Sequence, residues 1–149
     1  MTLSIRPATV ADIPALCVWN HAMARETEGL ELDPAVLERG VRGVFEQPQR
    51  GFYLVAEDAG VALGGLLVTR EWSDWRNGDY WWIQSVYVVP EARRGGVFRA
   101  LYAEVERRAR EARAASLRLY VEAENRRAQQ TYAGLGMHPS HYAMYEQLL

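Results

Sequence analysis

The chain has 149 residues, 49% of them hydrophobic and 11% aromatic, which is enough to bury the core of one domain over residues 1–149. The formal net charge of −2 at pH 7 argues against a dedicated nucleic-acid binder, since such proteins are usually clearly basic. The single cysteine, Cys17, excludes an intramolecular disulfide and any multi-cysteine metal site.

The sequence also carries information about cellular location and metal binding. The sequence has no signal-peptide pattern and no apolar run long enough to span a bilayer, so we expect a cytoplasmic protein with no membrane partner. The three histidines, His21, His138 and His141, have no Cys, Asp or Glu at the spacing of metal ligands, so no metal site is expected.

The N-terminal third predicts one strand followed by two helices. A short strand covers residues 3–6, and Thr9 to Asp12 form a capping box that begins a helix running through Met23. Asp33 followed by Pro34 begins a second helix. The apolar stripe of that second helix is Val36, Leu37, Val41 and Val44.

The middle of the chain predicts a hairpin and a long strand. Residues 52–56 and 61–69 form the hairpin around a turn at 57–60, and Gly64-Gly65 indicates a bulge or a close backbone approach. Residues 71–79 form a polar loop rich in tryptophan. Residues 80–89 form a long apolar strand inside the sheet.

The C-terminal half predicts a helix over 94–114, a strand over 117–121, a helix over 125–135 and a closing strand over 142–149. The element order is therefore β-α-α-β-β-β-α-β-α-β. This order indicates an α/β (mixed α+β) fold, with a central mixed sheet flanked by helices on both faces.

The most informative stretch runs from Val86 to Leu101. An apolar strand stops at Pro90, and a basic, glycine-bearing turn precedes a helix. Such a turn directs several backbone N–H groups one way, with the positive end of the helix dipole behind them, so it suits a phosphate or pyrophosphate. Nucleotide P-loop and dinucleotide fingerprints are absent. The alternative is an ordinary turn that connects a strand to a helix, with arginines that are simply solvated.

A second informative segment begins at Asn125, a good helix N-cap, and ends at Gly136, a good residue to follow a helix. Asn125 and Tyr132 are seven residues apart and share one helix face, so an amide and a phenol could flank one ligand. The alternative is that Tyr132 joins an apolar stripe with Ala128, Thr131 and Leu135.

Together the two segments resemble the GCN5-related N-acetyltransferase (GNAT) superfamily. The family motif Arg/Gln-x-x-Gly-x-Gly/Ala corresponds to Arg93-Arg94-Gly95-Gly96-Val97-Phe98. A later motif corresponds to Asn125, Ala128, Tyr132, Gly136 and Met137, and the resemblance covers essentially the whole chain. Phe98 departs from the family, which prefers Gly or Ala there. Its ring either points at the ligand or follows the apolar stripe of Leu101, Tyr102 and Val105.

The resemblance implies an acetyl-CoA-dependent N-acyltransferase, in which the acceptor amine attacks the thioester directly within a ternary complex. It implies that the turn holds the pyrophosphate, that strand backbone pairs with the pantetheine amides, and that Asn125 hydrogen-bonds to the cofactor. The implied cofactor residues are Val86, Tyr87, Val88, Arg93, Arg94, Gly95, Gly96, Val97, Phe98, Arg99 and Asn125. Tyr132 is the implied proton donor to the departing thiolate. Paired subunits, common in the family, suggest a homodimer.

Several functional questions stay open at this point. The base that accepts the proton of the amine could be Glu71, Asp79, a water bound to Gln84, or Tyr87. Trp72, Trp75, Trp81 and Trp82 could form an aromatic wall for an acceptor or partner, although one of Trp81 and Trp82 is expected in the core. Asp74 and Asp79 could attract a cationic amine. The competing functions are a non-catalytic acyl-CoA-binding or regulatory module and a pure interaction domain.

Overall fold

The computed structural model describes residues 2–149, which fall into two compact units, one ending at Leu119 and the other formed by Tyr120–Leu149. No helix in the described part of the chain combines the length and apolar character needed to cross a membrane. Each unit is considered by itself below.

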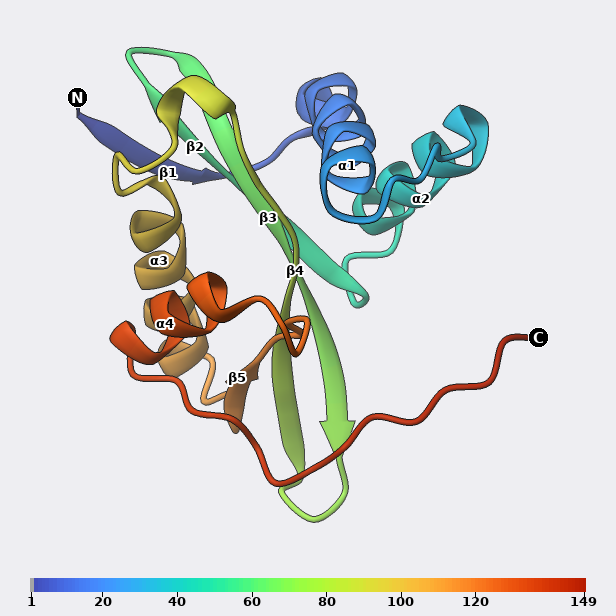
Figure 1. Ribbon diagram of the computed structural model, residues 1–149, viewed down its shortest axis with the longest axis vertical. Helices are drawn as coiled ribbons and strands as arrows, with labels where there is room; N and C mark the ends of the chain where they lie inside the picture. The colour runs from blue at the N-terminus through green and yellow to red at the C-terminus, as the bar shows by residue number, and fades with distance from the viewer. Residues whose placement is uncertain (1) are drawn as a thin grey trace. The chain divides into compact units, whose positions relative to one another are not determined.

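The first unit is built on a five-stranded mixed sheet whose strands lie in sequence order (Figure 1). The first four strands pair antiparallel, and the last two are parallel, joined by a helical crossover. The strands are β1 Leu3–Pro7, β2 Gly51–Asp58, β3 Val61–Ser73, β4 Gly78–Val88 and β5 Ser116–Arg118. The mixed α/β class predicted from the sequence is confirmed.

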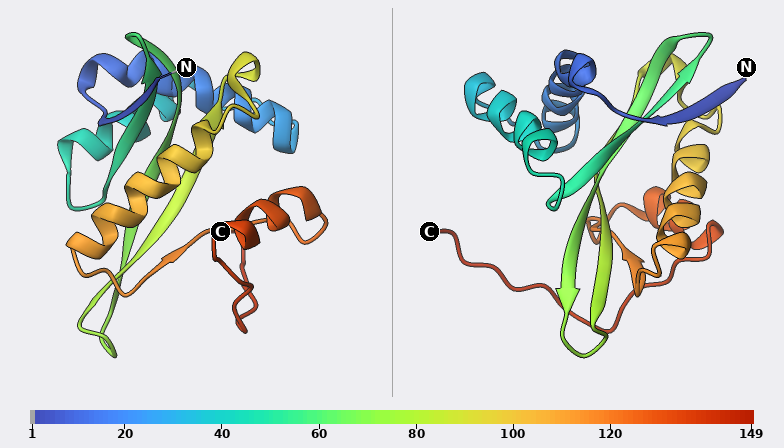
Figure 2. Two further views of the ribbon diagram at one scale, coloured as in Figure 1. Left: turned by 90° about the vertical axis from the view of Figure 1, so that its left-hand side faces the viewer. Right: turned by 180° about the vertical axis from the view of Figure 1, so that it is seen from behind.

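Helices cover both faces of this sheet, as predicted. Helices α1 (Ile13–Glu28) and α2 (Pro34–Glu46) lie on one face, and α3 (Val97–Glu111) lies on the other (Figures 1 and 2). Two short 3₁₀ turns, η1 (Val10–Asp12) and η2 (Pro90–Ala92), precede α1 and follow β4.

The start of α2 confirms the Asp33-Pro34 signal. Asp33 accepts hydrogen bonds from the N–H groups of Ala35 and Val36 at 2.9 and 3.3 Å. The predicted stripe of α2 is wrong at Val36, whose side chain is 57% exposed, whereas Val41 is buried. Val36 lies in the first turn of the helix on its exposed side, whereas Leu37, Val41 and Val44 contact the core.

Alternation along the strands produces two apolar layers. Tyr53 and Val55 of β2 pack with Leu16 and Trp19 of α1 and with Val41 of α2. The residues between them point to the opposite face, where α3 covers the sheet. The completely buried side chains of that second layer are Leu54, Leu66, Val68, Leu101 and Val105. Burial of each such side chain stabilises the fold by about 1.5–3 kcal/mol.

The structure confirms both features that Gly64-Gly65 indicated, a close backbone approach and a bulge. A Cβ at Gly64 would lie 2.5 Å from the carbonyl oxygen of Tyr87, and one at Gly65 would lie 2.7 Å from that of Leu54. The register of β3 against β4 shifts between Gly65 and Leu67. Only glycine permits these backbone approaches, because a Cβ would overlap a carbonyl oxygen on a neighbouring strand.

The predicted loop over residues 71–79 is wrong at both ends. Strands β3 and β4 continue through it, with Glu71 opposite Tyr80 and Trp72 opposite Asp79, so only residues 74–77 form the turn. The hairpin extends well past α1 and α2 (Figure 1). Cross-strand pairing therefore overrides the polar composition that favoured a loop.

The second unit contains α4 (Arg126–Gly134), close to the predicted helix. The helix ends in a Schellman motif, in which Gly136, with φ 96°, donates to the Ala133 carbonyl and Met137 to the Tyr132 carbonyl. The predicted closing strand over 142–149 is wrong, since that segment has no strand assignment. Its side chains are exposed, and apolar composition alone cannot supply the ladder of hydrogen bonds that defines a strand.

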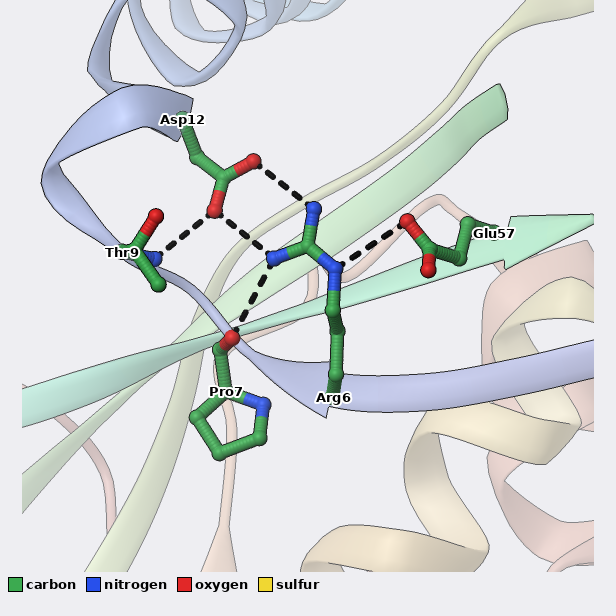
Figure 3. A network of polar contacts seen from close by, with 5 residues as sticks. All are labelled: Arg6, Pro7, Thr9, Asp12 and Glu57. Atoms are coloured by element: carbon green, nitrogen blue, oxygen red, sulfur yellow. Dashed lines mark hydrogen bonds and ion pairs between the residues drawn. The ribbon is translucent and has the colours of Figure 1, made fainter. Parts of the chain in front are cut away.

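A network of ion pairs and hydrogen bonds joins β1 to η1, which follows it, and to β2 (Figure 3). The guanidinium of Arg6 donates to both carboxylate oxygens of Asp12 at 2.8 and 2.9 Å and to Glu57 at 3.0 Å. Asp12 also accepts the Thr9 N–H at 2.7 Å, the interaction expected of the predicted capping box. The hydrogen bonds from Arg6 hold the pKa of the Asp12 carboxyl below its usual value.

We expect Asp12→Asn to destabilise the protein by about 1–2 kcal/mol at pH 7, since the Asp12 side chain is only 12% exposed but Arg6 is 36% exposed. The folded-state pKa of Asp12 is depressed, so its stabilisation is complete above the unfolded carboxyl pKa of about 4 and is lost below it. Thermal melts of both proteins should therefore differ at pH 7 and converge as the pH falls below about 4. Asp74→Asn, at an exposed hairpin position, is the control and should leave the melting temperature unchanged.

Candidate functional site

The segment between β4 and α3 forms an open backbone turn. After η2, Arg93 is extended, Arg94 has φ 67°, and Gly96 has φ 84° and is the N-cap of α3. The first intrahelical donor is Ala100, whose N–H bonds to the Gly96 carbonyl at 3.0 Å. The N–H groups of residues 97–99 therefore precede the helical ladder. Gly96 has no side chain to accept from them, which suits them to an anion.

The space in front of this helix end is open. A Cβ built on Gly96 would meet no heavy atom within 4 Å. Val97 is buried and anchors the start of the helix in the core. Arg94 and Arg99 are exposed and form no ion pair with any other described residue, so their positive charge is available beside the turn.

The side chain of Arg93, by contrast, bonds to the protein itself. Its Nε donates to the carbonyl oxygen of Val88 at 2.9 Å, and its Nη2 donates to both carboxylate oxygens of Glu26 at 3.2 and 3.0 Å. The guanidinium carbon lies 5.3 Å from the centre of the Tyr87 ring. Arg93 thus connects the turn to the end of β4 and to the last part of α1.

The ring of Phe98 lies along α3. Its centroid is 6.2 Å from that of Tyr102, one helical turn further on, with the rings tilted at 57°. Of the two orientations considered for Phe98, the structure shows the one in which the ring follows the apolar stripe.

Strand β4 offers a second feature, an edge without a neighbouring strand. Its pairing with β5 covers only Tyr80 to Trp82, so residues 83–88 have no described strand partner on that side. Ser85 has φ 51° where the register with β3 shifts, which places a bulge immediately before Val86.

Backbone alternation decides which groups face that open edge. The Val89 N–H bonds to the Leu63 carbonyl at 2.9 Å, so Tyr87, two residues earlier, directs its backbone toward its partner Gly65. Val88 then directs its backbone away from β3, which agrees with its carbonyl accepting from Arg93. The N–H of Val88 is the group left to pair with an added strand.

In the second unit, Asn125 caps α4, as predicted, because its Oδ1 accepts the Ala128 N–H at 3.1 Å. Tyr132 lies two turns further along and is partly buried. This burial raises the pKa of the Tyr132 phenol, so the hydroxyl stays protonated at neutral pH. Both residues belong to one short helix.

The candidate bases lie at different positions along the sheet. Glu71 is opposite Tyr80, five residues from the bulge at Ser85, which corresponds to about 16 Å along the strand. Glu71 also accepts the Trp82 Nε1–H at 2.8 Å. Asp79 is one residue further away. Gln84 adjoins the bulge and donates from Nε2 to the Thr69 hydroxyl oxygen.

The tryptophans divide as the strand alternation requires. Trp81 is buried and packs edge-to-face on Phe52 with ring centres 5.3 Å apart, which confirms the prediction that one of the strand pair lies in the core. Trp72 and Trp75, near the end of the hairpin, are 64% and 90% exposed. No group of three or more His, Cys, Asp or Glu side chains suited to a metal ion occurs within residues 2–149.

The model of the acetyltransferase (GNAT) family matches residues 14–137. Phosphinothricin N-acetyltransferase from Streptomyces viridochromogenes is 32% identical over 102 residues, which are 67% of this chain and 55% of that protein. The chain thus spans about half the length of this curated relative.

Solved structures show the same likeness over nearly the whole chain. The structure of a possible acetyltransferase from Clostridium difficile 630 has a TM-score of 0.93 at 39% identity and covers 100% of this chain and 99% of its own. The structure of a predicted acetyltransferase with acetyl-CoA from Clostridium acetobutylicum has a TM-score of 0.79 at 16% identity, covering 98% and 96%. At 16% identity the likeness concerns the fold alone.

Proposed function

The chain belongs to the acetyltransferase (GNAT) family, and we propose that it transfers an acetyl group from acetyl-CoA to an amine acceptor. The observation that carries this proposal is the turn before α3. Its glycine N-cap leaves the amides of residues 97–99 to face open space with two exposed arginines beside them. These groups suit the pyrophosphate of a coenzyme A ester, because backbone N–H groups and guanidinium ions both favour phosphate oxygens.

We assign the cofactor-binding roles as follows. The amides of residues 97–99 hold the pyrophosphate, and the guanidinium groups of Arg94 and Arg99 add charge. The open edge of β4 at residues 86–88 pairs with the amides of the pantetheine arm, chiefly through the Val88 N–H. Asn125 retains its side-chain N–H₂ for hydrogen bonding while its Oδ1 caps α4.

Acetyl-CoA supplies the acetyl group and a thiolate leaving group. The acceptor amine forms the new C–N bond as the C–S bond breaks, and we propose that Tyr132 gives its phenolic proton to the sulfur. The raised pKa of Tyr132 keeps that proton available at neutral pH. Gln84 keeps its carbonyl oxygen for a water that takes the proton from the amine, since its N–H₂ already bonds to Thr69.

The first test is calorimetric titration of acetyl-CoA into the purified chain, followed by thiol release with a panel of amines. Phosphinothricin heads the panel because a relative is named for it; polyamines, amino acids, aminoglycosides and peptide N-termini follow. Binding with turnover of one amine supports the proposal. Binding without turnover of any amine would favour a regulatory acyl-CoA-binding module. Absence of binding would leave an interaction domain.

The prediction of one domain over residues 1–149 becomes part of this proposal. The second unit, Tyr120–Leu149, has 30 residues. Chains below about 40 residues rarely fold without disulfides, metals or partners, and this unit contains no cysteine. We therefore expect it to fold only together with the preceding residues of the chain.

A further inference from the structure

We propose that Arg93 is a positioning residue that clamps the turn before α3 to helix α1 through Glu26, and that its side chain does not bind phosphate. This inference rests on the proposed function, since it concerns the same cofactor turn. It assigns a role to Glu26, an acidic residue 67 positions away in the sequence. A carboxylate would support the binding of a polyanionic cofactor.

The clamp joins three elements at one guanidinium. Nε holds the carbonyl at the end of β4, Nη2 holds the Glu26 carboxylate, and the guanidinium lies over the ring of Tyr87. Tyr87 is itself packed in the core formed with Leu16 and Trp19 of α1. Glu26 lies in the last turn of α1, so the clamp and the core fix the same helix from two sides.

The turn needs such support, because its backbone is strained immediately after Arg93. Arg94 adopts φ 67°, a left-handed conformation that is unfavourable for a non-glycine residue. Such conformations persist where surrounding contacts determine them. Arg93 supplies the contact that precedes the strained residue, and Val97, buried in the core, supplies the one that follows it.

Two of the three guanidinium nitrogens of Arg93 donate hydrogen bonds within the protein. Nε and Nη2 are bonded as described, and only Nη1 has no hydrogen-bond partner among the described residues. Arg94 and Arg99 are also exposed, but their side chains form no such hydrogen bonds to described residues. A direct contact between Nη1 and phosphate is therefore the alternative that a test must separate from the clamp.

Glu26→Gln separates the two roles by the direction of its effect. If Arg93 binds phosphate, removing the competing carboxylate frees the guanidinium and reduces local negative charge, so acetyl-CoA binds more tightly. If Arg93 is a clamp, the variant loosens the turn and acetyl-CoA binds more weakly. The pair is about half exposed, so we expect a Kd about two- to fivefold higher.

Arg93→Lys and the double variant complete the design. Lysine keeps a cation near the turn but cannot hold Val88, Glu26 and the Tyr87 ring together, so a clamp loses affinity and a phosphate contact largely keeps it. Adding Glu26→Gln to Arg93→Lys should then change Kd by less than about 1.5-fold, because the coupling is already broken. Thermal melts establish that each variant folds.

The salt dependence of Kd gives a readout that simple loss of structure would not move. Removing a cation in contact with phosphate flattens the fall of affinity with salt, because that charge pair is no longer screened. Arg94→Gln should flatten it and Arg93→Gln should not. Tighter or unchanged binding by Glu26→Gln, or a flattened salt dependence in Arg93→Gln, would overturn the clamp. Failure of the unaltered chain to bind acetyl-CoA would instead overturn the proposed function.

Discussion

Gly96→Glu is expected to weaken acetyl-CoA binding by at least about 100-fold, the largest effect of any single change in the turn. The space beside Gly96 is open, so the new side chain would stand in front of the amides of residues 97–99. A carboxylate about 4 Å from a phosphate charge costs about 4 kcal/mol at the effective dielectric of about 20 near a protein surface. Bulk in the same space adds to this repulsion.

The backbone at Gly96 requires a control for strain. With φ 84°, any substitution there costs conformational energy in addition to its effect on the ligand. Gly96→Gln has the same strain and nearly the same length but no charge. We expect calorimetry to show intermediate affinity for Gly96→Gln and none for Gly96→Glu, with similar melting temperatures for both. Retained affinity in the glutamate variant would remove the turn from the cofactor site.

The parts of the fold that were predictable from sequence depend on local signals. Asp33 and Asn125 cap the helices they were expected to cap, because a side-chain oxygen near the first N–H groups acts within three residues. Gly64-Gly65 predicted a close strand approach, since only the absence of a Cβ explains paired glycines inside an apolar strand. These signals need no knowledge of distant residues.

The errors in predicted secondary structure occur where pairing with a segment distant in the sequence determines whether a strand forms. Glu71, Trp72 and Asp79 have the composition of a loop, yet they lie in strands because the opposite strand pairs with them. The segment 142–149 has the composition of a strand but forms none. Tertiary context overrides propensity in both cases, and a single sequence does not contain that context.

The same distinction applies to the candidate site. The residues of the turn are contiguous, so sequence was sufficient to name them together and to predict an exposed backbone. The direction of the Arg93 side chain was not predictable, because it depends on Glu26 and on the carbonyl of Val88. The open edge of β4 likewise depends on how soon β5 stops pairing with it. The sequence was therefore sufficient to identify the residues of the candidate site, whereas the structure was needed to show how their side chains and strand edges are arranged.

Tyr132→Phe is expected to lower kcat by about 100-fold while leaving the Kd for acetyl-CoA within about twofold of its original value. General acids contribute about 10²–10⁴-fold, and a thiolate, whose conjugate acid has a pKa of about 8.5, needs less help than an alkoxide. The lower end of that range therefore applies. Phenylalanine keeps the ring and removes only the hydroxyl group, and with it the transferable proton.

The pH dependence of kcat separates an acid from a packing residue. Burial raises the pKa of Tyr132, so a rate that requires its protonated form should persist past the ordinary tyrosine pKa of about 10 before falling. That alkaline fall should vanish in Tyr132→Phe, because the variant has no proton to lose. Tyr145→Phe, at a side chain 94% exposed in the same unit, should keep both the rate and the profile. Unchanged turnover in Tyr132→Phe would exclude Tyr132 as the acid, whereas a raised Kd at unchanged kcat would assign it to binding.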